Sequence, residues 1–137
     1  MELTNKTVLI TGSSRGIGAA TALAFAKAGS RVILNARHEL PASLKQQLDE
    51  LGTEYCFLPG DVSDERVVKE LTKTAWENFG GIDELINNAG ITRDRLLIGM
   101  KTADFDEVLQ VNLKGPFLMI QALLKKMYKQ RAGVIIN

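Results

Sequence analysis

The chain has 137 residues, of which 45% are hydrophobic and 24% are charged, and its formal net charge is +1. This length suits one domain with a sizeable core, here residues 1–137. The composition is that of a folded protein rather than of a disordered or fibrous one. The small net charge gives no electrostatic reason to expect nucleic acid or a membrane as a partner.

The sequence predicts neither a membrane span nor a signal peptide. No apolar run is long enough to cross a bilayer, and the first residues, MELTNK, lack the basic and then apolar pattern of a leader. Cys56 is the only cysteine, so no intrachain disulfide can form, which favours a cytoplasmic location. With one histidine and one cysteine, we expect no metal site.

Short apolar runs alternate with longer helical segments along the chain. The apolar runs predict strands at residues 7–11, 31–34, 54–58, 84–87 and 134–136. The helical segments are residues 16–28, 41–51, a helix capped by Ser63 that ends near residue 80, and a long helix over about 102–131.

Repeated strand–helix alternation implies parallel strands that are joined by right-handed crossovers. The predicted fold class is therefore α/β, a Rossmann-type doubly wound sheet of five strands in the order 3-2-1-4-5. Ligands bind such sheets outside the carboxyl ends of the strands. Functional residues are expected just after each strand end.

A glycine-rich segment directly follows the first strand. Glycines at this turn let the backbone pass close to a pyrophosphate, and the next helix points its free N–H groups at the phosphates. The alternative is a tight strand-to-helix turn without a ligand, which the position before an Ala-rich helix disfavours. The segment comprises Gly12, Ser13, Ser14, Arg15, Gly16, Ile17 and Gly18.

The end of the second strand distinguishes between the two nicotinamide cofactors. An acidic residue there would bind the ribose 2′-hydroxyl of NAD, but this strand continues as Asn-Ala-Arg37 with no acid. An arginine can hold the 2′-phosphate of NADP with two hydrogen bonds, and Arg15 in the glycine loop can reach the same group. We therefore expect NADP(H); the alternative is that Arg37 is a solvated surface charge.

Four sequence motifs occur in an order and spacing that resemble the short-chain dehydrogenase/reductase family. The segment Asn87–Met100 is further similar to the 3-oxoacyl-acyl-carrier-protein reductases of fatty acid synthesis. The resemblance covers the whole chain but about the first half of a typical member, so we expect the C-terminal strands and helices to be missing. The motifs are TGSSRGIG, GDVSD at Gly60–Asp64, NNAG at Asn87–Gly90 and VNLKG at Val111–Gly115.

The resemblance assigns further residues to the cofactor. It implies that Asp61 accepts a hydrogen bond from the adenine amino group, with Val62 beside the ring, and that Val111 touches the nicotinamide ribose. The alternative for Asp61 is an ordinary role at a helix entry. The resemblance also places the residues after the fourth strand along the cofactor, namely Asn88, Ala89 and Gly90.

Asn112 corresponds to the catalytic-site asparagine of the family. Pro116, four residues later, has no N–H, so the Asn112 carbonyl loses its helical partner and is free to hold a water molecule. Gly115 eases the local distortion. The alternative is a simple kink with an asparagine that faces solvent.

The family's remaining catalytic residues, a serine and a Tyr-x-x-x-Lys pair, do not occur in the chain. The two tyrosines, Tyr55 and Tyr128, are followed four residues later by Pro59 and Ala132. We therefore expect a chain that belongs to an NADPH-dependent 3-oxoacyl-acyl-carrier-protein reductase but is inactive alone. The alternatives are a non-catalytic NADP-binding fragment and a reductase of another ketone or sugar.

The resemblance also implies partners. Arg131 would help to dock an acidic acyl carrier protein that bears the 3-oxoacyl substrate, although basic residues at a helix end commonly interact with the helix dipole instead. Full-length family members are expected to be homo-oligomers in which the long helix packs in a dimer interface. Apolar residues of this helix are Phe105, Leu109, Phe117, Ile120 and Leu124.

Overall fold

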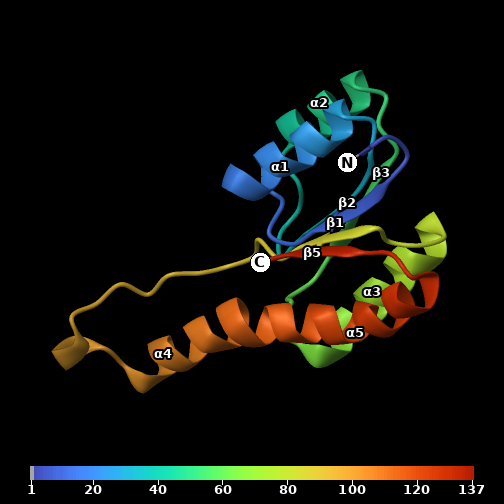
Figure 1. Cartoon of the computed structure of the whole chain (residues 1–137). Helices are drawn as coiled ribbons and strands as arrows, with labels where there is room; N and C mark the ends of the chain where they lie inside the picture. Colours follow the sequence, from blue (N-terminus) through green and yellow to red (C-terminus); the bar gives the residue numbers. More distant parts are fainter. Residues whose placement is uncertain (1) are drawn as a thin grey trace.

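The computed structural model describes residues 2–137, and its centre is a parallel five-stranded sheet (Figure 1). The strand order is β3-β2-β1-β4-β5, with every neighbouring pair parallel, as the sequence predicts. The strands are β1 (Thr7–Ile10), β2 (Arg31–Ala36), β3 (Tyr55–Pro59), β4 (Glu84–Ile86) and β5 (Val134–Ile136).

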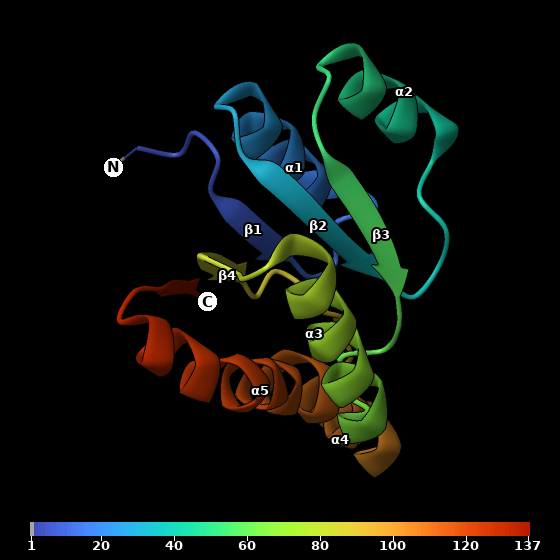
Figure 2. The ribbon, with the colours of Figure 1, turned by 90° about the vertical axis from the view of Figure 1, so that its right-hand side faces the viewer.

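Helices cover both faces of the sheet. Figures 1 and 2 show α1 and α2 on one side and α3 and α5 on the other, which is the arrangement that right-handed crossovers produce. The α-helices are α1 (Gly16–Lys27), α2 (Ala42–Glu50), α3 (Glu65–Phe79), α4 (Thr102–Leu109) and α5 (Gly115–Gln130). A 3₁₀ turn at Leu97–Gly99 and a π-helical turn at Gln110–Lys114 complete the set.

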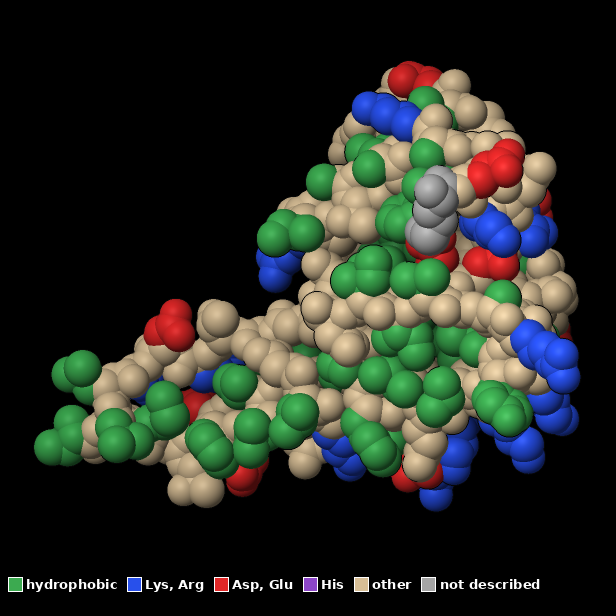
Figure 3. Space-filling model, viewed as in Figure 1, with side chains coloured by type: hydrophobic (Ala, Val, Ile, Leu, Met, Phe, Trp, Pro, Cys, Tyr) green, Lys and Arg blue, Asp and Glu red, His purple; other side chains and the backbone are tan. Residues whose placement is uncertain are grey.

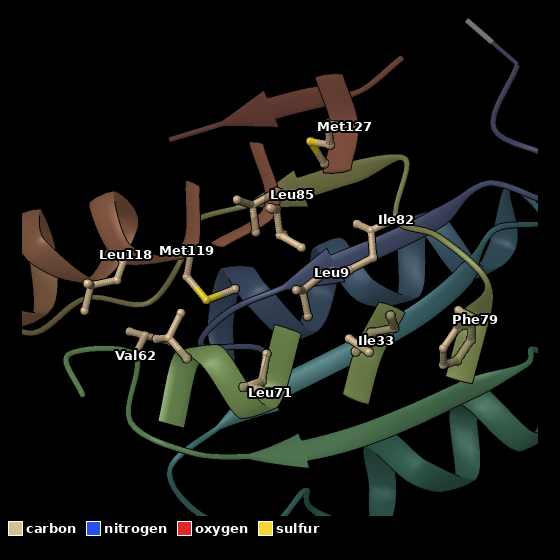
Figure 4. Packing of buried hydrophobic residues seen from close by; sticks show 13 residues of the cluster. Leu9, Ile33, Val62, Leu71, Phe79, Ile82, Leu85, Leu118, Met119 and Met127 are labelled. Atoms are coloured by element: carbon tan, nitrogen blue, oxygen red, sulfur yellow. The ribbon is translucent and has the colours of Figure 1, made fainter. Parts of the chain in front are cut away.

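Alternate residues of each strand face the two helical layers. Leu9 and Leu85 point towards α3 and α5, where they pack with buried residues such as Leu71 and Met119 (Figure 4). Val8 and its neighbours on the other face pack against α1 and α2. Because both faces are covered, the central strands are mostly apolar on both sides, as is usual for parallel sheets; Asn35 and Glu84 are buried polar exceptions.

The long helix expected over residues 102–131 is interrupted. The π-helical turn separates α4 from α5 and ends at Lys114, two residues before Pro116. A proline removes one helical N–H and its ring displaces the preceding turn, which accounts for the interruption at this place.

The prediction that Ser63 caps the third helix is wrong. Asp64 is the capping residue, and its carboxylate accepts hydrogen bonds from the backbone N–H groups of Arg66 and Val67. Ser63 instead donates its hydroxyl to Asp61 at 2.7 Å. Aspartate and serine are comparable caps, so local sequence does not decide between two adjacent candidates.

The segment between β4 and α4 forms an arm that leaves the body of the protein. Figure 1 shows residues 91–101 running out from the sheet before the chain returns along α4. Arg93 is held to Glu107 by two hydrogen bonds of 2.9 Å, and Arg95 lies 3.4 Å from Asp104. These ion pairs fix the outgoing chain to α4.

Candidate cofactor-binding site

The glycine loop lies at the carboxyl end of β1, where two of its glycines are required by close contacts. Gly12 has a φ of +64°, and a Cβ there would lie 2.7 Å from the Ala89 Cα. A Cβ on Gly18 would collide with the Gly12 carbonyl and the Asn88 side chain. The loop therefore packs against the backbone that follows β4.

Thr11 joins the glycine loop to the segment after β4. Its hydroxyl accepts hydrogen bonds from the N–H groups of Asn88 (3.1 Å) and Ala89 (3.0 Å). The Asn88 side chain returns two hydrogen bonds, to the carbonyls of Thr11 (3.1 Å) and Gly12 (3.0 Å). The sequence placed Thr11 at a strand end and in the TGSSRGIG motif but did not indicate these contacts, because Asn88 lies 77 residues further along the chain.

A second buried network of hydrogen bonds joins the carboxyl ends of β1, β2 and β3. The Ser13 hydroxyl donates to the Ile10 carbonyl at 2.9 Å and accepts from the Asn35 N–H at 2.9 Å. The Asn35 amide donates to the carbonyls of Leu58 (3.0 Å) and Gly60 (3.2 Å). Asn35 was not among the predicted site residues, because its side-chain partners come from a distant strand.

A hollow of about 630 Å³ opens at this edge of the sheet. All but two of the residues predicted to bind the cofactor line this hollow. The two exceptions, Ser13 and Gly18, are buried and do not reach its surface. His38 and Ile91 line the hollow in addition. The predicted residues on its wall are Gly12, Ser14, Arg15, Gly16, Ile17, Arg37, Asp61, Val62, Asn88, Ala89, Gly90 and Val111.

The charges around the hollow favour an anion. Arg15 and Arg37 reach it from two different loops, and the N-terminus of α1 has neither an acidic residue in its first turn nor a capping side chain. Free N–H groups at a helix N-terminus attract phosphate. Asp61 also lines the wall, and its Oδ1 accepts hydrogen bonds from the Ser63 N–H (2.9 Å) and hydroxyl (2.7 Å).

Asn112 lies in the π-helical turn; it contacts Ile91 on the wall of the hollow but does not itself line that hollow, and it lines a smaller one beside α4 instead. Its side chain accepts a hydrogen bond from the Ile91 N–H and donates one to the Ile91 carbonyl, both at 2.9 Å. This pairing holds the segment after β4 against the helix. Gly115 follows the turn, and a Cβ there would lie 3.0 Å from the Val62 Cγ2, so the glycine allows close packing as well as the distortion expected from the sequence.

Arg131 lies at the opposite edge of the sheet. It follows α5 with a φ of +55° and precedes β5, so it is at the amino end of that strand. A separate hollow of about 560 Å³ is lined there by Lys129, Arg131 and apolar residues that include Leu124 and Ile135. The structure therefore does not bring Arg131 together with the glycine loop.

Within residues 2–137, no helix is long and apolar enough to cross a membrane. In the same part of the chain, no three side chains of the metal-binding types are grouped so that they could hold a metal ion.

The chain belongs to the short-chain dehydrogenase family, whose model matches residues 6–137. It is 44% identical to the 3-oxoacyl-[acyl-carrier-protein] reductase of Thermotoga maritima over 144 residues, covering 100% of this chain and 56% of that relative. It is 43% identical to the reductase of the same name from Synechocystis, covering 98% of this chain and 56% of the relative.

A solved structure has the same fold. The protein from Sinorhizobium meliloti 1021, assigned as a short-chain alcohol dehydrogenase, superimposes with a TM-score of 0.92 at 36% identity, covering 98% of this chain and 54% of that chain. The chain thus spans about half the length of the relatives that it matches.

Proposed function

We propose that this chain is the cofactor-binding part of an NADPH-dependent oxidoreductase that reduces a 3-oxoacyl thioester on acyl carrier protein to the 3-hydroxyacyl form. The main support is the hollow at the carboxyl ends of the strands, which Arg15 and Arg37 both line and where the residue directly after β2 is an arginine rather than an acid. The names of the Thermotoga and Synechocystis relatives support the substrate class.

Each part of the cofactor has a chemically suitable place on the wall of the hollow. The pyrophosphate fits the glycine loop and the N-terminus of α1, because both offer free N–H groups. The two arginines suit a ribose 2′-phosphate, since guanidinium groups bind phosphate through paired hydrogen bonds. Asp61 has a second carboxylate oxygen that no hydrogen bond to Ser63 uses, and we assign it to the adenine amino group.

The bound nicotinamide supplies a hydride, so the protein has to supply geometry and a proton. Asn88, Ala89, Gly90 and Val111 line the remaining part of the hollow and would hold the nicotinamide half. Asn112 positions the adjacent segment through Ile91. We retain the proposal that the Asn112 carbonyl holds a water of the proton relay, because Pro116 offers it no N–H.

The 137 residues alone are expected to bind the cofactor without turning over substrate. Tyr55 donates its hydroxyl to Asp49 at 3.0 Å, and Tyr128 lies beside the second hollow, so neither tyrosine faces the cofactor hollow. A proton donor must lie within hydrogen-bonding reach of the reacting group. The catalytic serine and Tyr-x-x-x-Lys pair of the family would have to come from residues outside this sequence.

We further propose a cytoplasmic location, a homo-oligomeric full-length protein, and docking of acyl carrier protein near Arg131. The docking proposal is supported by the second hollow, in which Lys129 and Arg131 offer positive charge beside apolar side chains. An acidic carrier with an acyl chain has the matching chemistry.

Direct titration with NADPH and NADH tests the cofactor proposal. We expect NADPH to bind at least about tenfold more tightly, since a charge-assisted phosphate contact contributes about 1.5–3 kcal/mol. Arg37→Gln should remove most of this preference and leave NADH binding unchanged. Equal affinities for the two cofactors in the unaltered chain would refute the proposal.

Addition of a 3-oxoacyl thioester to the NADPH complex tests the proposed lack of turnover. We expect no loss of NADPH absorbance beyond a protein-free blank. Oxidation of NADPH by the 137-residue chain would show that the missing serine and tyrosine are not required.

A further inference from the structure

A smaller hollow of about 240 Å³ lies between the arm after β4 and helix α4, and we call it the arm hollow. It is separate from the cofactor hollow, but Ile91 lines both, so the two hollows share part of a wall. Asn112 lines the arm hollow and is hydrogen-bonded to Ile91. The arm hollow therefore begins beside the residues proposed to hold the nicotinamide half of the cofactor.

Four apolar side chains line the arm hollow. Ile91 and Met100 belong to the arm, whereas Phe105 and Val108 lie three residues apart on α4 and so share one face of that helix. Phe105 is 52% exposed, so the described residues leave part of this apolar wall uncovered. Uncovered apolar surface in a concave site is typical of places where a ligand binds.

The charged groups around the arm hollow are paired or exposed to solvent. Arg93 is held to Glu107 by two hydrogen bonds of 2.9 Å, and Asp104 lies 3.4 Å from Arg95. Asp94 is exposed. Because the paired charges already contact one another, the hollow offers a new ligand mainly apolar contacts. The same ion pairs hold the arm against α4 and so maintain the shape of the hollow.

The size of the arm hollow limits what can occupy it. Sites for a whole drug-sized ligand measure about 300–1,000 Å³, so a hollow of about 240 Å³ accepts only part of a ligand. A methylene group is similar in size to a water molecule, which occupies about 30 Å³ in the liquid. The arm hollow thus has room for at most about eight methylene groups.

We propose that the arm hollow is the subsite for the alkyl end of the 3-oxoacyl substrate, with Phe105 and Val108 as specificity-determining residues for chain length. This inference rests on the reductase function proposed above. The 3-oxo carbon has to lie close to the nicotinamide to accept the hydride, and the alkyl chain leaves this carbon on the side away from the thioester. At Ile91 the chain passes from the reacting carbon into the arm hollow.

The hollow beside Arg131 does not meet the same requirement. It is lined by apolar residues such as Leu124, but it shares no lining residue with the cofactor hollow. An alkyl chain bound there would hold the 3-oxo carbon away from the nicotinamide. Its proposed role in docking the carrier protein is unaffected.

Binding of 3-oxoacyl thioesters of N-acetylcysteamine to the 137-residue chain tests the inference, because the residues that line the arm hollow all belong to this chain. We would titrate the acetoacetyl, 3-oxohexanoyl, 3-oxooctanoyl, 3-oxodecanoyl and 3-oxododecanoyl thioesters in the presence of NADP+, which cannot supply a hydride. We expect the affinity to rise by up to about fourfold for each buried methylene group. The rise should stop once about eight carbons lie beyond the 3-oxo carbon.

Two matched tryptophan variants show which hollow holds the chain. Val108→Trp fills the arm hollow, so it should bind every thioester about as weakly as the acetoacetyl one, while its affinity for NADPH is unchanged. Leu124→Trp, the same change in the hollow beside Arg131, should leave the dependence on chain length intact. If Leu124→Trp and not Val108→Trp removes this dependence, the alkyl chain binds in the other hollow and the inference is wrong.

A smaller side chain gives a test that does not depend on whether the tryptophan variant folds. Val108→Ala enlarges the arm hollow, so the affinity should continue to rise to a longer chain than in the unaltered protein. A plateau at the same chain length would contradict the assignment of Val108.

The outcomes distinguish this inference from the proposed function. If NADPH does not bind to the unaltered chain, the reductase function is wrong and the subsite is wrong with it. If NADPH binds but the thioesters do not, or bind equally whatever their length, only the subsite is wrong. If Val108→Trp instead dissociates an oligomer of the unaltered chain in sedimentation experiments, a second copy occupies the arm hollow and the inference also fails.

Discussion

Residues 2–90 bury nearly all of their large apolar side chains, whereas residues 91–137 leave many of theirs exposed. In the first part the large apolar residues that remain exposed are Ile17, which lines the cofactor hollow, and Leu51. In the second part the exposed set is much larger, and Figure 3 shows hydrophobic side chains along the arm after β4 and α4. These residues are Leu96, Leu97, Ile98, Phe105, Leu109, Leu113, Phe117, Leu124, Tyr128, Val134 and Ile136.

The difference follows from how many neighbours each element has. In the first part, α2 and α3 each pack one apolar face onto the sheet and expose a polar one, and α1 exposes mainly glycine and alanine besides Ile17 and Lys27. α5 buries Leu118, Met119, Leu123 and Met127 but has apolar residues on its opposite side as well. Large exposed apolar patches are typical of surfaces that another element or chain covers. Residues 2–90 thus pack almost completely against one another, whereas in residues 91–137 one face of α5 stays uncovered.

The largest effect is expected in α5, which packs one apolar face against the core and leaves other apolar residues exposed. Leu123 is fully buried and its neighbour Leu124 is 52% exposed. Leu123→Ala should lower the free energy of unfolding by about 2–5 kcal/mol, whereas Leu124→Ala should change it by less than about 0.5 kcal/mol. Urea denaturation followed by circular dichroism measures both; similar losses for the pair would mean that both faces of α5 are covered in solution.

A smaller difference between two matched variants is expected at the glycine loop. Gly12 and Gly52 share a φ of +64°, but a Cβ would meet the Ala89 backbone only at Gly12 and nothing within 4 Å at Gly52. Both alanine variants incur the strain of the left-handed conformation, about 1–2 kcal/mol. Gly12→Ala should cost about 1–3 kcal/mol more, because the contact with Ala89 must open.

The Gly12→Ala and Gly52→Ala variants also test the candidate cofactor-binding site. NADPH binding, measured where each variant is still folded, should be lost in Gly12→Ala and retained in Gly52→Ala. If the two variants had equal stability and equal binding, the close approach of the loop to Ala89 would be refuted.

The smallest effect concerns Glu84, which lies within the well-buried first half. Glu84 is 2% exposed, and among the described residues its Oε2 has no hydrogen-bond partner. Burial and then the nearby Asp83 raise the pKa of Glu84, while Lys6 acts in the opposite direction. The folded state therefore holds this proton more tightly than the unfolded chain does.

Stability should consequently decrease as the pH rises through the ordinary range of a glutamate pKa, and the cost is largest above the raised pKa. Glu84→Gln should stabilise the fold by about 1 kcal/mol near neutral pH, with a smaller gain in acid. Glu70→Gln, the same change on the exposed surface of α3, is the control and should do little at either pH. A gain at Glu84 that does not vary with pH would contradict this account.

The alternation of apolar runs and helical segments was sufficient to predict the strands, the parallel sheet and its order, because each pattern is local and crossovers have one hand. The positions of the glycine loop and Arg37 on the hollow, and a local distortion near Pro116, could also be predicted, since each depends on residues that are close in sequence; the division of the long helix into α4 and α5 was not predicted. The tertiary structure was needed for the roles of Ser13 and Thr11, whose hydrogen-bond partners include residues on distant strands.

The exposed and buried faces of α4 and α5 show most clearly what local sequence cannot determine. Of the apolar residues named from the sequence, Ile120 packs against the core while Phe105, Leu109, Phe117 and Leu124 are exposed. Met127 is buried, whereas its neighbour Tyr128 is 82% exposed. A helix that is apolar on both sides has no unique buried face, so only the position of the sheet decides which side becomes core.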